Sequence, residues 1–136
     1  MAGNTAHRRV ARSLGDAQDR RLGDAIDLAY LAHFTLGNAA LEREVLELFV
    51  EQMPLYLAAL GEARARRGWR EAAHSIKSSA CAVGAWRLAS FAQMAERVDI
   101  EGEAASAQGH REKAVAAVAS AAEETCRFIA RVLAGG

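Results

Sequence analysis

Apolar residues recur at every third or fourth position along most of this 136-residue chain. That spacing places them on one face of an α-helix, whereas a half-buried β-strand would alternate strictly. No convincing alternation and no internal repeat is found, only one proline occurs, and alanine is frequent. Both composition features favour helix. The sequence therefore predicts an all-α protein.

Glycine and polar residues divide the periodic regions into five helices. The predicted helices span residues 24–35, 39–66, 69–82, 86–100 and 110–133. Asp24 is the expected cap of the first, and Gly37-Asn38 separates it from the second. Helices with short connections pack antiparallel, so we expect an antiparallel four-helix bundle with one or two short additional N-terminal helices.

The second predicted helix is the longest before the histidine-containing segment. We expect Gly68 to end it and Pro54 to bend it near residues 52–54 without splitting it. Its apolar stripe, expected to face the core, consists of Leu41, Val45, Leu48, Phe49, Leu55, Ala59 and Leu60.

The segment before the bundle is less regular. It carries a weak apolar series at Val10, Leu14 and Ala17 among charged residues. We interpret residues 1–21 as a tail or an extra amphipathic helix. Residues 22–134 are expected to form the bundle domain.

Charge and cysteine content exclude several classes of function. Seventeen basic and 17 acidic residues give a formal net charge of zero, so no general attraction to nucleic acid or to an anionic membrane is expected. Cys81 and Cys126 form neither a disulfide framework nor a metal cluster. No signal peptide and no membrane-spanning apolar run is found. We expect a cytoplasmic monomer.

The segment 69–84 divides into two faces at the helical period. Its apolar stripe consists of Ala73, Ile76, Ala80 and Val83. A different stripe consists of His74, Lys77, Ser78 and Cys81. A histidine in the middle of a helix, facing away from the predicted core, is a candidate reactive group.

The chemistry of this stripe favours phosphoryl transfer. At neutral pH much of an exposed imidazole is the free base, and its ring nitrogen can attack phosphorus. Lys77, one turn on, would stabilise the negative charge of the phosphoryl group. Ser78 and Cys81 keep the surrounding surface low for another protein's active site, and Arg70 adds positive charge on the same face.

Residues 73–84 read AHSIKSSACAVG. They resemble the signature of histidine-containing phosphotransfer (HPt) domains of two-component phosphorelays: His, any residue, Leu, Lys, Gly, two small residues and a later Gly. Residues 37–38, 49–60 and 68–69, with Leu88 and Glu96, are also similar to this family. The likeness covers roughly residues 22–100, and the last helix is compatible with it.

The resemblance implies a role for particular residues. His74 would be the phosphoacceptor, Lys77 would steady the phosphoryl group, and Gly84 would be the structural turn after the histidine helix. The family implies a four-helix bundle without catalytic machinery or a cofactor of its own. The aspartyl phosphate and Mg²⁺ belong to the partner receiver domain.

The chain also departs from the family pattern. Ser78 replaces a usual glycine, Ile76 replaces a usual leucine, and Ala92 and Ala95 stand where larger apolar residues are commoner. In some members a polar side chain from the next helix holds the histidine ring. Gln93 and Glu96 are both candidates for that role.

Other interpretations compete with phosphotransfer. Glu71-x-x-His74 matches half of a di-iron pattern, but such sites need two pairs and further glutamates, so no metal site is expected. A kinase phosphoacceptor module would continue into a nucleotide-binding domain, and no Gly-rich nucleotide signature is found. A non-catalytic helical interaction module, an HPt-like fold without phosphotransfer, is the remaining alternative.

The preferred hypothesis is a phosphorelay phosphocarrier rather than an enzyme. His74 would accept a phosphoryl group from a receiver-domain aspartate or a hybrid histidine kinase and pass it to a response regulator. The expected partners are receiver domains, with no nucleic acid and no membrane.

Overall fold

The computed structural model describes residues 25–102 and 105–135, and every regular element in those ranges is an α-helix. The expectations for residues 1–21 lie outside this part of the chain. The helices are α2 (Leu28–Phe34), α3 (Ala39–Glu62), α4 (Arg66–Val83), α5 (Trp86–Glu96) and α6 (Ala105–Gly135). The prediction of an all-α fold is confirmed.

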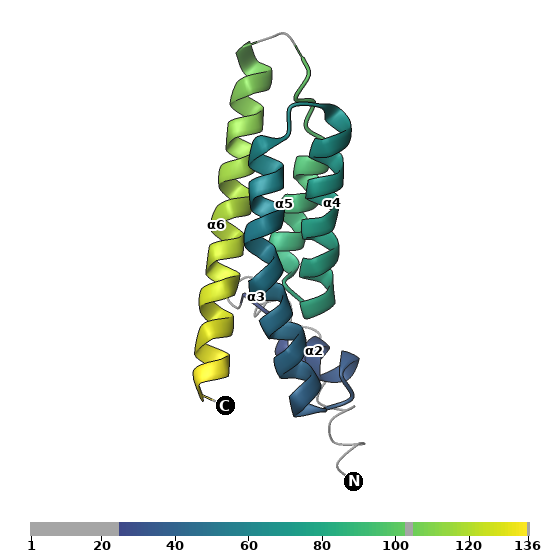
Figure 1. Ribbon diagram of the computed structural model, residues 1–136, viewed down its shortest axis with the longest axis vertical. Coiled ribbons are helices and arrows are strands. Elements are labelled where there is room, and N and C mark those ends of the chain that lie inside the picture. Colours follow the sequence, from purple (N-terminus) through teal and green to yellow (C-terminus); the bar gives the residue numbers. More distant parts are fainter. Residues whose placement is uncertain (1–24, 103–104, 136) are drawn as a thin grey trace, which may run out of the picture.

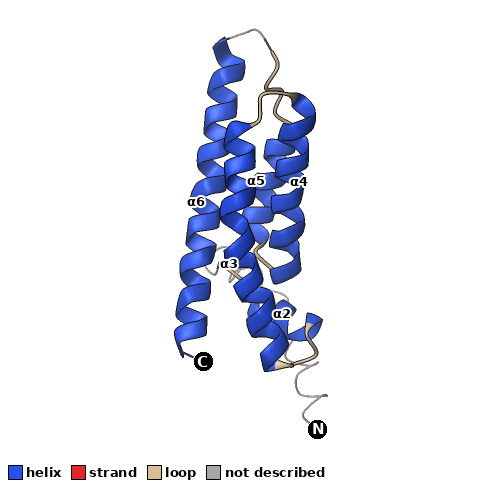
Figure 2. Cartoon of the chain, in the orientation of Figure 1, coloured by secondary structure: helices blue, strands red, loops and turns tan. Residues whose placement is uncertain are grey.

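Helices α3 to α6 lie side by side and alternate in direction, while α2 lies at one end beside the first turns of α3 (Figure 1). Figure 2 shows how short the connections from α2 to α5 are. This arrangement confirms the antiparallel four-helix bundle with a short additional helix. It also follows from the connections, because short loops force neighbouring helices to reverse direction.

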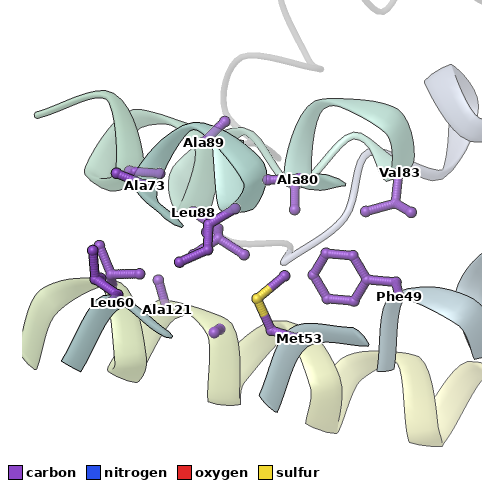
Figure 3. Packing of buried hydrophobic residues seen from close by; sticks show 14 of the residues in the cluster. Phe49, Met53, Leu60, Ala73, Ala80, Val83, Leu88, Ala89 and Ala121 are labelled. Atoms are coloured by element: carbon purple, nitrogen blue, oxygen red, sulfur yellow. The ribbon is translucent and has the colours of Figure 1, made fainter. Parts of the chain in front are cut away.

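The core of the bundle is built from one stripe of each long helix. From α3 the buried residues are Leu46, Phe49, Met53 and Leu60, each exposed by 3% or less. In Figure 3 the side chains of α3 face those of α4 and α5 across the interior. The α4 stripe was predicted correctly, since Ala73, Ile76, Ala80 and Val83 are all buried.

Three leucines of α3 that were predicted to be in the core lie on the surface instead. Leu41, Leu48 and Leu55 are 39%, 51% and 69% exposed. Helix α3 carries two rows of residues that contain leucines and repeat at the same seven-residue step. Because the step is the same, spacing alone cannot show which row faces the core. The core takes the row that contains Leu46, Met53 and Leu60, because that row shares a face with Phe49.

The boundary between α3 and α4 was also predicted wrongly. Gly68 does not end α3: it lies inside α4, and α3 ends earlier, at Glu62. Arg111 of α6 donates to the carbonyl oxygens of Gly61 at 2.7 Å and Ala63 at 3.1 Å, which caps α3. This cap comes from a residue about 50 positions away, so local sequence could not reveal it.

The start of α4 has a similar explanation. Ala65, its N-cap residue, makes no side-chain capping bond. Instead the backbone N–H of Arg66 donates to Oε2 of Glu101 at 2.6 Å. A carboxylate at a helix N-terminus satisfies a free donor and favours the helix dipole. This contact lets α4 begin at Arg66, three residues earlier than predicted.

The short helix α2 is fixed to the turn between α4 and α5. Its N-cap is Asp27, not Asp24 as predicted, and Asp24 lies outside the described residues. The N–H of Asp27 donates to the carbonyl oxygen of Gly84 at 2.9 Å, and the indole N–H of Trp86 donates to Oδ2 of Asp27 at 3.0 Å. These two bonds hold α2 against the end of the histidine helix.

Gly84 ends α4 in the left-handed conformation, with φ of 76°. A Cβ at this position would lie 3.0 Å from the carbonyl oxygen of Asp27. Glycine is therefore required twice here, once for the backbone conformation and once for the close approach of the segment before α2.

Three further predictions concern the continuity of α3, the end of α5 and the start of α6. Helix α3 continues through Pro54 unbroken, as predicted. Helix α5 ends at Glu96, four residues early, because the following turn uses its own bonds, including one from the N–H of Glu101 to Oδ1 of Asp99 at 3.0 Å. Helix α6 begins at Ala105 rather than at His110. None of the helices in the described ranges combines the length and apolarity that a membrane crossing requires.

Candidate functional site

His74 lies on the outer face of α4, and 67% of its side chain is exposed to solvent. The residues of the α4 core stripe that come before and after His74 explain this position. Ala73 before it and Ile76 after it are fully buried, so the imidazole is rotated away from the interior. The prediction that this histidine faces solvent is confirmed.

Glu96, at the end of α5, is the carboxylate that faces the imidazole. Its Oε1 lies 3.5 Å from Nδ1 of His74, and 26% of the glutamate side chain is exposed. This oxygen is buried and has no hydrogen-bond partner. A buried acceptor without a donor costs about 1–3 kcal/mol, and the N–H of His74 could satisfy it after a small ring movement, since Nδ1 lies 3.5 Å away.

Gln93, the other candidate from α5, is exposed. Within the described ranges, no hydrogen bond or ion pair connects it to His74. Of the two candidates, the structure brings only Glu96 into contact with the ring. Sequence spacing could not separate them, because the two residues are three positions apart on the same helix.

The position of Glu96 depends on a buried tryptophan. The indole N–H of Trp69 donates to the carbonyl oxygen of Ala95 at 2.7 Å, and Trp69 is fully buried. This bond joins the first turns of α4 to the last turn of α5, one residue before Glu96. The guanidinium of Arg111 stacks over the same indole, 5.6 Å from the ring centroid.

Sequence reasoning missed this bracing by Trp69. A large aromatic residue next to a glycine, five residues before the histidine, is consistent with core packing but does not reveal a hydrogen-bond partner in another helix. The signal available in the sequence was an indole N–H at a position on the core stripe, since a buried indole usually finds an acceptor.

The cations near the histidine differ in whether they already form an ion pair. Lys77 is half-buried, one turn from His74 on α4, and it forms no ion pair with any residue in the described ranges. Arg70 is exposed one turn before His74. Arg67 is already paired with Glu71, 3.1 Å apart. Lys77 and Arg70 are therefore the cations left to meet an anion on this face.

A second charged group lies just beyond α5. The backbone N–H of Glu101 and the guanidinium of Arg66 hold the pKa of the Asp99 carboxyl below its ordinary value, and Arg70 adds a weaker attraction. Arg66 also pairs with Asp99 at 3.4 Å. This cluster connects the turn after α5 to the start of α4.

Small side chains of α4 lie close to the histidine. Ser78 is exposed and Cys81 is half-buried with a free thiol. Between α3 and α4 runs a shallow groove of about 390 Å³, with Tyr56 and Ala59 on one wall and Glu71 and Ser75 on the other. His74 does not line this groove, although its neighbour Ser75 does.

The acidic side chains near His74 form no cluster of metal-ligand type within the described ranges. Among the described residues, no group of three or more His, Cys, Asp or Glu side chains could hold an ion. Glu71 pairs with Arg67 at 3.1 Å. The arrangement instead offers one exposed imidazole, one carboxylate behind it and nearby cations.

Such an arrangement defines a class of protein: an antiparallel helical bundle in which one long helix presents a histidine to solvent beside a carboxylate from the next helix. The family model described as the Hpt domain matches residues 44–129, which is more than half of the chain and includes α4 and α5 entirely. The chain therefore belongs to the Hpt domain family. Searches of curated proteins and of solved structures returned no match.

Members of this family are phosphocarriers of two-component systems and interact with receiver domains; they are not catalytic enzymes. The match ends inside α6 and begins inside α3, so it covers the candidate site and the helices that support it. The resemblance found in residues 73–84 is thereby confirmed at the level of the family.

Proposed function

We propose that this protein is a phosphorelay phosphocarrier in which His74 receives a phosphoryl group from a receiver-domain aspartate, or from a hybrid histidine kinase, and passes it to a response regulator. The observation that carries the proposal is the exposed imidazole, 67% accessible, on a rigid helix of an Hpt-family bundle. In this proposal the protein is a cytoplasmic monomer, and Mg²⁺ is bound by the receiver.

The contact with Glu96 favours one ring nitrogen as the nucleophile. Nδ1 lies 3.5 Å from the carboxylate, so a proton on Nδ1 is stabilised there and Nε2 keeps its lone pair. Nε2 then bonds to phosphorus while the bond from phosphorus to the aspartyl oxygen breaks, and the aspartate leaves as a carboxylate. The proton stays on Nδ1, so Glu96 acts as a positioning residue.

Lys77 and Arg70 would offset the charge that the phosphoryl group brings. Neither cation is used in an ion pair in the described part of the chain, and each lies one turn from His74. A cation without an ion pair can turn toward a new anion without breaking one, and Arg70 would give up only its weak attraction to Asp99.

Labelling from a phosphorylated receiver tests the assignment. A receiver domain charged with radiolabelled acetyl phosphate and Mg²⁺ should transfer acid-labile, base-stable label to the wild-type chain and none to His74→Ala. His33→Ala and His110→Ala, which alter other exposed histidines, are the matched controls and should label normally. Label that persists in His74→Ala would reassign the acceptor.

Docking is tested by adding bulk beside the acceptor. Ser78 is exposed on the His74 face, so Ser78→Trp should block transfer while leaving the bundle folded. Ser120→Trp, at an exposed position on α6, is the matched control and should transfer normally. A Ser78→Trp variant that transfers at the wild-type rate would refute the proposed approach of the receiver over this face.

The alternative is a helical interaction module that binds a receiver without accepting phosphate. The contact between Glu96 and His74 favours transfer, because a purely structural histidine on the surface has no need of a buried carboxylate. Receiver binding by titration calorimetry, together with no label on His74, would establish the alternative.

A further inference from the structure

A regular row of leucines and glutamates runs along the outer face of α3. Leu41, Leu48 and Leu55 follow one another at seven-residue steps, with Glu44 and Glu51 between them. Residues at spacings of three, four and seven lie along one line of a helix. We call these five residues the Leu–Glu stripe. All five are exposed, and the leucines are 39–69% accessible.

The side chains of the Leu–Glu stripe are exposed, and its glutamates form no ion pair within the described ranges. Neither Glu44 nor Glu51 forms an ion pair with any residue of the described ranges, whereas Arg43, the one arginine of α3, is paired with Glu47 at 3.4 Å. Rows of exposed leucines are unusual on a surface that nothing covers. A partner complementary to the Leu–Glu stripe would therefore present apolar side chains and cations together.

A second copy of this chain is a poor partner for the same face. Two stripes brought together would oppose glutamate to glutamate, and like charges at an interface oppose association. Helix α3 contains five glutamates and one arginine, so the repulsion between two copies would extend along the helix.

The segment before Ala25 has the complementary chemistry. Residues 1–24 contain five arginines and three aspartates, and the apolar series Val10, Leu14 and Ala17 has helical spacing. The segment is also attached at a suitable place. The chain enters the described region at Ala25, beside the α4–α5 turn, at the end of the bundle where α3 begins (Figure 1).

The lengths match as well. The stripe spans 14 residue steps, or about 21 Å at 1.5 Å per residue, and residues 6–22 would cover about 25 Å as a helix. Because the segment is tethered to the bundle, its effective concentration is on the order of millimolar, so even a weak contact would be populated.

We propose that residues 6–22 bind the Leu–Glu stripe of α3 within the same chain, with their apolar series on the leucines and their arginines on Glu44 and Glu51. Leu55 adjoins Tyr56 and lies one turn from Ala59, which line the groove beside the histidine helix. The bound segment would border the face that a receiver must approach, a consequence that rests on the proposed function.

Leucine methyl NMR on the full chain tests the binding without using phosphotransfer. Arg8→Glu, Arg9→Glu and Arg12→Glu, combined in one variant, should shift the methyl signals of the stripe leucines by more than a linewidth. Adding Glu44→Lys and Glu51→Lys to that variant exchanges the charges and should return the signals toward their wild-type positions. Salt should weaken the contact, because the screening length falls from about 10 Å at 0.1 M to about 3 Å at 1 M.

A matched control changes charge elsewhere. Arg127→Glu with Arg131→Glu alters two exposed arginines of α6 and should leave the stripe signals unchanged. Stripe signals that do not move in the triple arginine variant would overturn the proposal. Signals that move with protein concentration would also overturn it and identify a second copy as the occupant. Signals that respond only to an added receiver domain would overturn it in favour of the receiver.

Discussion

Replacing Glu96 by methionine should move stability and transfer in opposite directions. The carboxylate oxygen that faces His74 is buried and lacks a hydrogen-bond donor, which costs the folded state about 1–3 kcal/mol. Methionine has a similar volume and no such acceptor. Since 26% of the Glu96 side chain is exposed, water already offsets part of the cost, so we expect Glu96→Met to stabilise the bundle by about 1 kcal/mol.

The same substitution should slow phosphotransfer. Transfer makes the ring cationic, and a small ring movement would then let the N–H at Nδ1 donate to the carboxylate, which methionine cannot replace as an acceptor. A hydrogen bond to a charged group contributes about 1.5–3 kcal/mol, and the exposure of His74 places the effect at the lower end, which corresponds to about a tenfold loss of rate. Glu96→Gln keeps the shape and one acceptor oxygen, so it should transfer faster than Glu96→Met.

Two measurements decide this prediction. Urea denaturation of wild type and variants gives the change in unfolding free energy, provided the slope is unchanged. Single-turnover labelling from a phosphorylated receiver gives the transfer rate. A Glu96→Met protein that transfers at the wild-type rate would refute the positioning role, and one that is less stable than wild type would refute the assignment of a costly buried oxygen.

Three further predictions concern neighbouring features. Lys77→Ala should leave stability nearly unchanged and shorten the lifetime of phospho-His74 about two- to fivefold, measured by loss of label. Gly84→Ala should destabilise the fold by about 2 kcal/mol in urea because of its left-handed backbone, whereas Gly109→Ala, with open space around the new methyl group, should stabilise α6 by about 1 kcal/mol. Folding favours the ionised form of Asp99, whose pKa is lowered, so its contribution is present above about pH 4 and lost on acidification. Asp99→Asn should therefore reduce the difference between urea midpoints measured at pH 7 and pH 3, and an unchanged difference would contradict this account.

The sequence predicted the helices and the division of α4 into two faces, because both depend on periodicity within one segment. The stripe that contains Ile76 is continuous and has no competitor on that helix, so its burial was predictable. On α3 two rows with the same period compete, and the prediction placed Leu48 in the core although it is half-exposed. Periodicity shows that a row is apolar and does not show which row the neighbouring helices will cover.

The errors at the helix ends have a different cause. Helix α4 starts early because Glu101 accepts from the N–H of Arg66, and α3 is capped by Arg111, in each case across 35 or more residues. At the site, Glu96 and Gln93 could be distinguished only in three dimensions. The bond from Trp69 to Ala95 fixes the last turn of α5, and no local pattern encodes that contact.

Two hydrogen bonds between residues far apart in the sequence lie at opposite ends of the bundle. At one end Trp86 donates to Asp27, and at the other Arg111 donates to Gly61, with the partners 59 and 50 positions apart in the sequence. Regions that depend on a few such contacts open most readily in the native state. His74 lies between the two ends, where α4 packs against its sequence neighbours. Fraying at the Trp86 end would therefore leave the acceptor helix and its glutamate in register, whereas fraying at the Arg111 end would loosen Trp69, whose bond to Ala95 fixes the last turn of α5. Slow amide exchange should centre on the stretch of α4 around His74.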